Sequence, residues 1–380
     1  GAFGFENVVY GHWIVAEIEQ PEGFILALEM HHVYVDSDGE TIKLVMTNEH
    51  IKGNVLLTKF DADYPENKLT GAVFVVYLDV NGDGKPDDGD IFVADLAETE
   101  KGLYELKDLP YGKYLLLETV APEGFEKDEN AYPFEIRENG EAVAVENETG
   151  IGFFNRAQRG NLIIEKSSED GVVEGFEFVV EGTDFLGNAF SETYVTDADG
   201  KINVSLRPGN YTVYEKESDG NIRYVLPDSQ TVEIKAGEDS TLAFVNNLKK
   251  GSVEFRKVDK ATGKPLAGVS FAIYDAEKNL IAEGKTDADG LLRFDDIAYG
   301  NYFWQEIATV DGYIAESGYH EFSVTENGQV LEFTVENEPI PDVPKTGDDS
   351  NLPLWFGLLT LSGGTLAGLL FFDKKRRCKA

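Results

Sequence analysis

The stretch that decides the fold is Gly251-Ser252-Val253-Glu254-Phe255-Arg256-Lys257, in which apolar and polar side chains alternate. Alternation with a period of two is typical of a β-strand that has one face in a hydrophobic core. Side chains two residues apart lie on the same face of a strand, so Lys257 shares the inner face with the apolar residues. The pattern therefore predicts a strand that carries a lysine into the core.

This stretch occurs in three copies, and each copy opens a unit with the same marks. A lysine follows six residues after the opening glycine, a glutamate ends a later Gly-x-aromatic-x-x-x-Glu segment, and an asparagine closes the unit. The three sets are Lys59, Glu118 and Asn155; Lys166, Glu215 and Asn246; and Lys257, Glu306 and Asn337. Residues 1–50 carry only the last two marks, Glu17 and Asn48. We expect them to be the C-terminal part of a further unit whose lysine strand is cut away.

Secondary structure is predicted to be mostly strand. Short alternating runs are separated by turn signals such as Asp-Ala-Asp-Gly at 197–200 and 287–290. Complete units of this size, built from short strands, favour an all-β chain of tandem immunoglobulin-like β-sandwich domains. The expected domains are 1–50 (truncated), 51–158, 159–249 and 250–339, followed by a C-terminal segment at 340–380.

Strand parity places all three polar residues of each set on the core face. Each lysine, glutamate and asparagine lies two residues from an apolar side chain of its own strand. A buried charge is costly unless it is paired or neutralised. One interpretation is a buried lysine–glutamate ion pair with the asparagine as hydrogen-bond partner. The other interpretation is covalent, and the recurrence of the same set in every complete unit favours it.

In the covalent interpretation, burial makes the lysine a neutral amine and the glutamate a neutral acid. The amine attacks the asparagine carboxamide, the glutamic acid polarises the carbonyl and moves protons, and ammonia leaves. The predicted isopeptide bonds are Lys59–Asn155, Lys166–Asn246 and Lys257–Asn337, with Glu118, Glu215 and Glu306 as catalytic residues. Glu17 and Asn48 have no lysine partner. The reaction requires no cofactor, and such bonds would replace disulfides in a chain with one cysteine.

The repeats resemble the collagen-adhesin B-type (SpaA/prealbumin-like) domains of Gram-positive adhesins and pilins. The segment at 114–125, Tyr-Leu-Leu-Leu-Glu-Thr-Val-Ala-Pro-Glu-Gly-Phe, is similar to the glutamate motif of that family. Leu69-x-Gly71-x-x-Phe74 also fits, whereas Glu215 lacks the Pro-x-Gly-aromatic tail. The resemblance covers nearly all of residues 1–347. It implies a prealbumin-like sandwich whose cross-link joins the first and last strands.

The end of the chain carries a three-part signal. Residues 352–372 contain no charge and are long enough to cross a bilayer as a helix, and basic residues follow at 374–379. Before them stands Val343-Pro344-Lys345-Thr346-Gly347. This tail resembles the LPxTG-type cell-wall sorting signal of Gram-positive surface proteins, with Val343 in place of leucine. A permanent transmembrane anchor is the alternative interpretation.

The resemblance to a sorting signal implies an extracellular protein anchored to the cell wall. A sortase would cleave between Thr346 and Gly347 and join Thr346 to peptidoglycan, after a transient stay of 352–372 in the membrane. The class of sortase stays open because of Val343.

An acidic loop at 79–90 follows the ligand spacing of an EF-hand. Oxygen donors occupy loop positions 1, 3, 5, 9 and 12, with a glycine at position 6. The candidate calcium ligands are Asp79, Asn81, Asp83, Asp87 and Asp90, together with the carbonyl of Lys85. A solvated acidic hairpin is the alternative.

Composition excludes several functions. The net charge of −37 argues against a nucleic-acid partner. The five histidines fit no metal or triad spacing, so we expect no enzyme beyond self-directed cross-linking.

The sequence favours the stalk of a wall-anchored adhesin, with any host or extracellular-matrix ligand bound by a missing N-terminal region. One alternative is a minor, tip or base pilin. A backbone pilin is disfavoured because Tyr64-Pro65 is followed by Glu66 where such pilins have lysine. A more distant alternative is the stalk of a secreted surface enzyme whose catalytic domain is missing.

Overall fold

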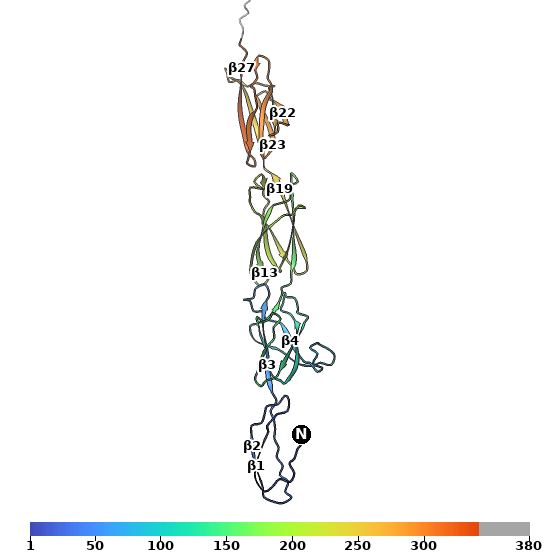
Figure 1. Ribbon diagram of the computed structural model, residues 1–380. Coiled ribbons are helices and arrows are strands. Elements are labelled where there is room, and N and C mark those ends of the chain that lie inside the picture. The colour runs from blue at the N-terminus through green and yellow to red at the C-terminus, as the bar shows by residue number, and fades with distance from the viewer. Residues whose placement is uncertain (342–380) are drawn as a thin grey trace, which may run out of the picture. The chain divides into compact units, whose positions relative to one another are not determined.

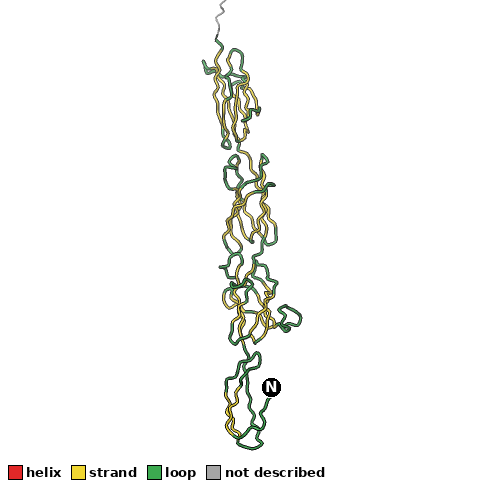
Figure 2. The backbone as a smooth tube through the Cα atoms, viewed as in Figure 1, coloured by secondary structure: helices red, strands yellow, loops and turns green. Residues whose placement is uncertain are grey.

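The computed structural model describes residues 1–341, and every regular element in that range is a β-strand. Figure 2 shows strands joined by loops and turns, which confirms the all-β class. The predicted sorting motif, apolar span and basic tail lie outside the described residues. No helix among the described residues is long and apolar enough to cross a membrane.

Residues 1–50 form a single antiparallel hairpin of β1 (Gly11–Ala16) and β2 (Met30–Val35). Large apolar side chains of this segment are exposed, for example Ile18 and Leu28. None of its residues belongs to a buried hydrophobic cluster of the described chain. The segment therefore lacks the second sheet and the core that the following units have.

Residues 51–158 form two facing sheets, as the resemblance implies (Figure 1). The first sheet has the order β10-β3-β7-β6, with β11 also paired to β3, and the second has the order β5-β4-β8-β9. The strands are β3 (Lys52–Asp61), β4 (Val73–Leu78), β5 (Ile91–Asp95), β6 (Ala97–Glu100), β7 (Leu103–Pro110), β8 (Gly112–Val120), β9 (Ala131–Ile136), β10 (Ala142–Ala144) and β11 (Phe153–Asn155).

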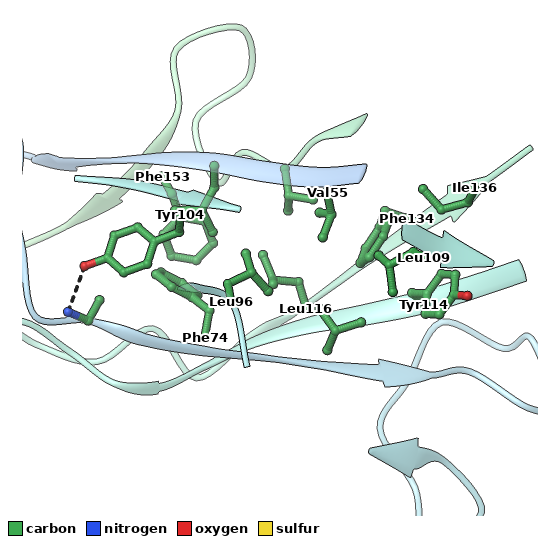
Figure 3. Packing of buried hydrophobic residues seen from close by; sticks show 14 residues of the cluster. Val55, Phe74, Leu96, Tyr104, Leu109, Tyr114, Leu116, Phe134, Ile136 and Phe153 are labelled. Atoms are coloured by element: carbon green, nitrogen blue, oxygen red, sulfur yellow. Dashed lines mark hydrogen bonds between the residues drawn. The ribbon is translucent and has the colours of Figure 1, made fainter. Parts of the chain in front are cut away.

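The inner faces of these two sheets enclose an aromatic core (Figure 3). Phe74 packs edge-on against Tyr104 and Phe153, with ring centroids 5.2 and 5.0 Å apart. The hydroxyl of Tyr104 accepts a hydrogen bond of 3.0 Å from the backbone amide of Ala72, drawn as a dashed line in Figure 3. The buried hydroxyl is thereby satisfied, as a polar group in a core must be.

Residues 159–248 repeat this arrangement with the sheets β15-β12-β19-β17 and β14-β13-β16-β18. The strands are β12 (Gly160–Ser168), β13 (Glu177–Asp184), β14 (Ala189–Val195), β15 (Lys201–Leu206), β16 (Gly209–Glu215), β17 (Tyr224–Val225), β18 (Gln230–Ile234) and β19 (Asp239–Leu248).

Residues 250–339 form a third sandwich with the sheets β23-β20-β27-β25 and β22-β21-β24-β26. The strands are β20 (Lys250–Asp259), β21 (Ser270–Tyr274), β22 (Leu280–Lys285), β23 (Leu291–Ala298), β24 (Gly300–Ala308), β25 (Tyr313–Ile314), β26 (His320–Val324) and β27 (Val330–Pro339). Each complete domain has its own buried hydrophobic cluster.

In each complete domain the first strand runs parallel to the last strand and is hydrogen-bonded to it. The pairs are β3 with β11, β12 with β19, and β20 with β27. Parallel neighbours must be joined by a long connection, and here the rest of the domain is that connection. The start and the end of each domain are thus brought into one sheet, which positions the site described below.

Candidate functional site

The lysine, glutamate and asparagine of each complete domain come together in its interior. In residues 250–339, Lys257 lies on β20 and Asn337 on the parallel strand β27, where Asn337 is paired with Asp259. Because Asp259 is two residues beyond Lys257, the lysine and the asparagine share the inner face. Glu306 approaches from β24 in the facing sheet.

The burial predicted from strand parity is confirmed for all three sets. No side chain of the nine is more than 6% exposed, and Lys59, Lys257 and Asn246 are fully buried. The sequence therefore located three lysines inside hydrophobic cores, where an unpaired ammonium would be strongly disfavoured.

In residues 250–339 the three groups are in mutual contact. The Nζ of Lys257 lies 2.5 Å from Oδ1 of Asn337 and 2.9 Å from Oε2 of Glu306. Asn337 donates through Nδ2 to Oε1 of Glu306 at 2.6 Å and to Oγ1 of Thr309 at 2.7 Å. The amine thus lies beside the carboxamide, and the carboxyl group contacts both.

Residues 51–158 reproduce this contact set. The Nζ of Lys59 donates to Oδ1 of Asn155 at 2.5 Å. The Nδ2 of Asn155 donates to both carboxyl oxygens of Glu118, at 2.9 and 2.8 Å. Lys59 and Glu118 are 3.8 Å apart. Two domains therefore place an amine, a carboxamide and a carboxyl group in the same order.

The set in residues 159–248 is arranged differently. The Nζ of Lys166 donates to the backbone carbonyl of Ser167 at 2.7 Å and lies 3.9 Å from Oε2 of Glu215. Asn246 still donates to Oε1 of Glu215 at 2.8 Å, but its own Oδ1 is buried without a hydrogen-bond partner, as is Oε2 of Glu215. Glu215 also receives a hydrogen bond of 3.0 Å from the side chain of Asn221.

Burial changes the ionisation of these groups. Desolvation lowers the pKa of Lys59 to about 8, against the opposing effect of Glu118, Asp128 and Asp61. Desolvation likewise lowers the pKa of Lys166 to about 8 and lowers that of Lys257. Burial raises the pKa of Glu118, although hydrogen bonds from the Asp128 amide and Asn155 oppose the change. Both directions favour the neutral amine and the neutral acid that carboxamide attack needs.

A turn glycine fixes the backbone of each lysine. The lysine amide donates to the glycine carbonyl at 2.7 to 2.8 Å in the pairs Lys59–Gly102, Lys166–Gly200 and Lys257–Gly290. These glycines have positive φ, and a Cβ on Gly290 would lie 2.5 Å from the carbonyl oxygen of Lys257. A larger residue would push the strand away, so the turn signals seen in the sequence also hold the site.

Sequence reasoning missed a backbone contact that orients the glutamates. The amide ten residues after the glutamate donates to its carboxylate, at 2.8 to 3.1 Å, in the pairs Ala27–Glu17, Asp128–Glu118 and Glu316–Glu306. The constant spacing after the Pro-x-Gly-aromatic or Gly-aromatic tail is the signal that could have revealed it. Glu215 lacks this tail, and there the side chain of Asn221 is the donor instead.

Residues 1–50 keep the glutamate–asparagine contact. Asn48 donates through Nδ2 to Oε2 of Glu17 at 2.6 Å and to the carbonyl of Ile25 at 2.8 Å. The one lysine of this segment, Lys43, is exposed. The segment therefore resembles the site of a complete domain without its amine.

The acidic loop at 79–90 follows β4 and stands away from the two sheets (Figure 1). Asp79 is 6% exposed and accepts hydrogen bonds from the amides of Gly82 and Gly84 at 2.7 and 2.9 Å. Asn81 donates to Asp87 at 2.7 Å.

Other loop carboxylates accept from loop amides in the same way: Asp83 from Lys85, and Asp90 from Asp87. Within residues 1–341, no group of three or more His, Cys, Asp or Glu side chains converges on one metal position. Calcium binding stays a prediction.

The sequence matches the SpaA prealbumin-like fold domain over residues 1–50, 53–149, 160–248 and 251–339. The chain belongs to this family. The B-type resemblance is thereby confirmed, and the segment 1–50 is matched along with the three complete domains.

Relatives of this SpaA-family chain include serine-aspartate repeat-containing protein F of Staphylococcus epidermidis, which is 25% identical over 357 residues. That match covers 80% of this chain and 22% of the relative. Serine-aspartate repeat-containing protein D of Staphylococcus aureus is 24% identical over 65% of this chain and 21% of the relative. The chain thus spans about a fifth of the length of these relatives.

A solved structure, the Bacillus anthracis TIE protein, matches 82% of this SpaA-family chain and 54% of its own chain. Its TM-score is 0.57 and its sequence identity is 25%. The tandem prealbumin-like sandwich is therefore shared with a known structure.

Proposed function

We propose that this chain is the structural stalk of an extracellular surface protein and that intramolecular isopeptide bonds stiffen its domains. The observation that carries the proposal is the contact of a buried amine, a carboxamide and a carboxyl group in residues 51–158 and again in residues 250–339. A buried ion pair alone would not require an asparagine carboxamide in contact with both the lysine and the glutamate.

The chemistry needs only these three side chains. The neutral Nζ of Lys257 attacks Cγ of Asn337, and Glu306 contacts both the attacking Nζ, at 2.9 Å, and the leaving Nδ2, at 2.6 Å. A new C–N bond forms, the bond from Cγ to Nδ2 breaks, and one proton passes from Nζ through the glutamate to the leaving nitrogen. The products are a secondary amide and one molecule of ammonia, so no oxidant or cofactor is consumed.

The proposal extends to Lys166 and Asn246, where the amine must first turn away from the Ser167 carbonyl. The Oδ1 of Asn246 is buried without a donor, which carries a free-energy cost. Rotation of the lysine toward Asn246 would give that oxygen its hydrogen bond and bring the amine to the carboxamide.

A mechanical role follows from where the cross-linked residues stand in the chain. Lys59 lies on the first strand and Asn155 on the last strand of its domain, 96 residues apart in sequence. Tension along the chain would enter on β3, cross the new bond and leave after β11. The intervening residues would then lie off the path of the force and could not be pulled out.

Attachment to the cell wall completes the proposed function. The tail at 343–347 resembles a sorting motif, and it precedes the apolar span 352–372 and the basic tail 374–379. We propose that a sortase links Thr346 to peptidoglycan.

Intact mass spectrometry of the whole chain tests the cross-links. The expected mass is lower than the sequence mass by three ammonia molecules, and digestion should yield branched peptides that join each lysine to its asparagine. An intact mass equal to the sequence mass would refute the covalent reaction and leave buried ion pairs in its place.

A further inference from the structure

Arg207 is buried although it follows β15 in a turn, where a charged residue is expected to face solvent. Only 5% of it is exposed. Its Nη2 donates to Oδ2 of Asp61 at 2.8 Å, and Asp61 is a fully buried residue at the end of β3 in the preceding domain. The Nε of Arg207 lies 3.2 Å from Asp184 of its own domain. The guanidinium therefore joins carboxylates of two domains.

Aromatic rings from both domains surround this guanidinium. Its central carbon lies 5.0 Å from the ring centroid of Tyr64 and 5.6 Å from that of Phe125, both in residues 51–158. Phe185 of the following domain lies 5.4 Å away on the same basis. Rings at this distance exclude water and attract a cation, which strengthens the ion pairs they enclose.

A glycine makes room for the docked ring. Gly124 has a φ of +81°, and a Cβ there would lie 2.5 Å from the ring of Phe185. Phe125 and Phe185 then meet edge to face with centroids 5.7 Å apart. Because Gly124 has no side chain, the Pro-Glu-Gly-Phe corner at 122–125 leaves room for a ring of the next domain.

The same corner receives a ring at the preceding junction. Gly23 also has a φ of +81°, and its Cβ position lies 3.3 Å from the ring of Tyr111. The hydroxyl of Tyr111 donates to Glu22 at 2.7 Å. Two successive Pro-Glu-Gly-Phe corners therefore each carry an aromatic ring of the domain that follows, and only the second adds a buried arginine.

Comparison between the domains explains why Asp61 needs a partner from outside. In residues 250–339 the corresponding aspartate, Asp259, accepts a hydrogen bond of 2.6 Å from the hydroxyl of Tyr313. Asp61 and Asp259 are paired with Asn155 and Asn337 respectively, so they occupy the same register position. The position of Tyr313 is taken by Phe125, which has no hydroxyl. The Oδ1 of Asp61 accepts a hydrogen bond of 2.9 Å from the Asp63 amide, and its Oδ2 takes from Arg207 the hydrogen bond that a tyrosine gives to Asp259.

We propose that the Pro-Glu-Gly-Phe corner is a docking site for the next domain, and that Arg207 locks residues 51–158 and 159–248 into one rigid body. Undocking would break the ion pair between Arg207 and Asp61, leaving the guanidinium only Asp184 of its own domain and Asp61 only the amide of Asp63, so the docked state is favoured. The exposed ion pair of Arg159 with Asp63 and the half-buried hydrogen bond between Asn67 and Asn188 add to the same surface.

Distance measurements between spin labels on the full chain in detergent would test the lock. Labels on cysteines at the exposed positions Lys107 and Glu192, in a Cys378→Ser background, report the relation of the two domains. A second pair at Glu192 and Lys235 reports whether residues 159–248 remain folded.

We expect a narrow distribution of interdomain distances in the parent chain. The control Arg156→Gln, which removes an exposed arginine between β11 and β12, should give the same narrow distribution. Arg207→Gln and Asp61→Asn should each broaden the interdomain distribution at least twofold while the Glu192–Lys235 distribution stays narrow. The double variant should be no broader than either single variant, because the two residues act as one pair.

A broad distribution in the parent chain, or a narrow one in both single variants, would overturn the proposal. If Arg207→Gln also broadened the Glu192–Lys235 distribution, loss of folding would explain its effect. Asp61→Asn would then decide alone, because that change lies in the other domain.

Discussion

Replacing Asn337 with alanine should remove one cross-link and leave the Lys257–Glu306 ion pair in place. The bond would close a loop of 80 residues, counted from Lys257 to Asn337. In the chain-entropy treatment such a loop is worth about 4.5 kcal/mol, and 1 kcal/mol shifts the melting temperature of a domain of this size by about 4–8 °C. The third domain should therefore melt at least about 20 °C lower in Asn337→Ala.

Glu306→Ala should lower the melting temperature further. It removes the catalyst and also leaves the fully buried Lys257 without its carboxylate. Calorimetry would follow the unfolding, and the intact mass of each variant should fall short of its own sequence mass by two ammonia molecules, one fewer than in the parent chain. Glu332→Ala, an exposed change on β27, is the matched control and should alter neither quantity. A full mass deficit in Glu306→Ala would refute the catalytic role, and an unshifted transition in Asn337→Ala would refute the reasoning about the loop.

Three further expectations concern other parts of the chain. In Asn155→Ala, Lys59 stays an amine whose pKa is lowered from 10.5 to about 8. Between these pH values the unfolded state binds more protons than the folded state, so the free energy of unfolding should rise with pH by about 3 kcal/mol. Urea midpoints would show this rise in the variant and should lack it in the parent chain, whose amine is consumed. Asp79→Ala combined with Asp83→Ala should abolish calorimetric heat on adding calcium at roughly millimolar concentration, and a parent chain that gives no heat would disprove the site. Thr346→Ala should move the protein from the cell-wall fraction to the membrane or the medium, and unchanged wall linkage would rule out sorting at this motif.

Much of the fold and of the site could be predicted because strand parity is encoded locally. The alternation around Lys257 fixes which face is buried, and the same arithmetic on the last strand brings Asn337 to that face. Burial of the nine side chains then follows without knowledge of the tertiary structure. Because the pattern recurs in three copies, the same burial was predicted independently for each complete domain.

The remaining contacts depend on residues that are distant in the sequence. Arg207 reads as an ordinary turn residue before Pro208, and its partner Asp61 stands 146 positions away in another domain. Strand parity likewise does not predict the hydrogen bond of Lys166 to the Ser167 carbonyl or that of Asn221 to Glu215. The period of two along a strand predicts which face of the strand is buried. It does not predict which of several polar side chains bonds to a given partner.

The parallel pairing of the first and last strands also sets the order in which the protein can be completed. A domain of this topology cannot finish folding until its last strand is present, because β20 pairs with β27 and β3 pairs with β11. Contacts of such long sequence separation form late and slowly. A chain that is synthesised from its N-terminus should therefore complete the folding of one domain before the next. Each lysine remains apart from its asparagine until the whole domain is available to fold, so the isopeptide bond can form only after the last strand has paired.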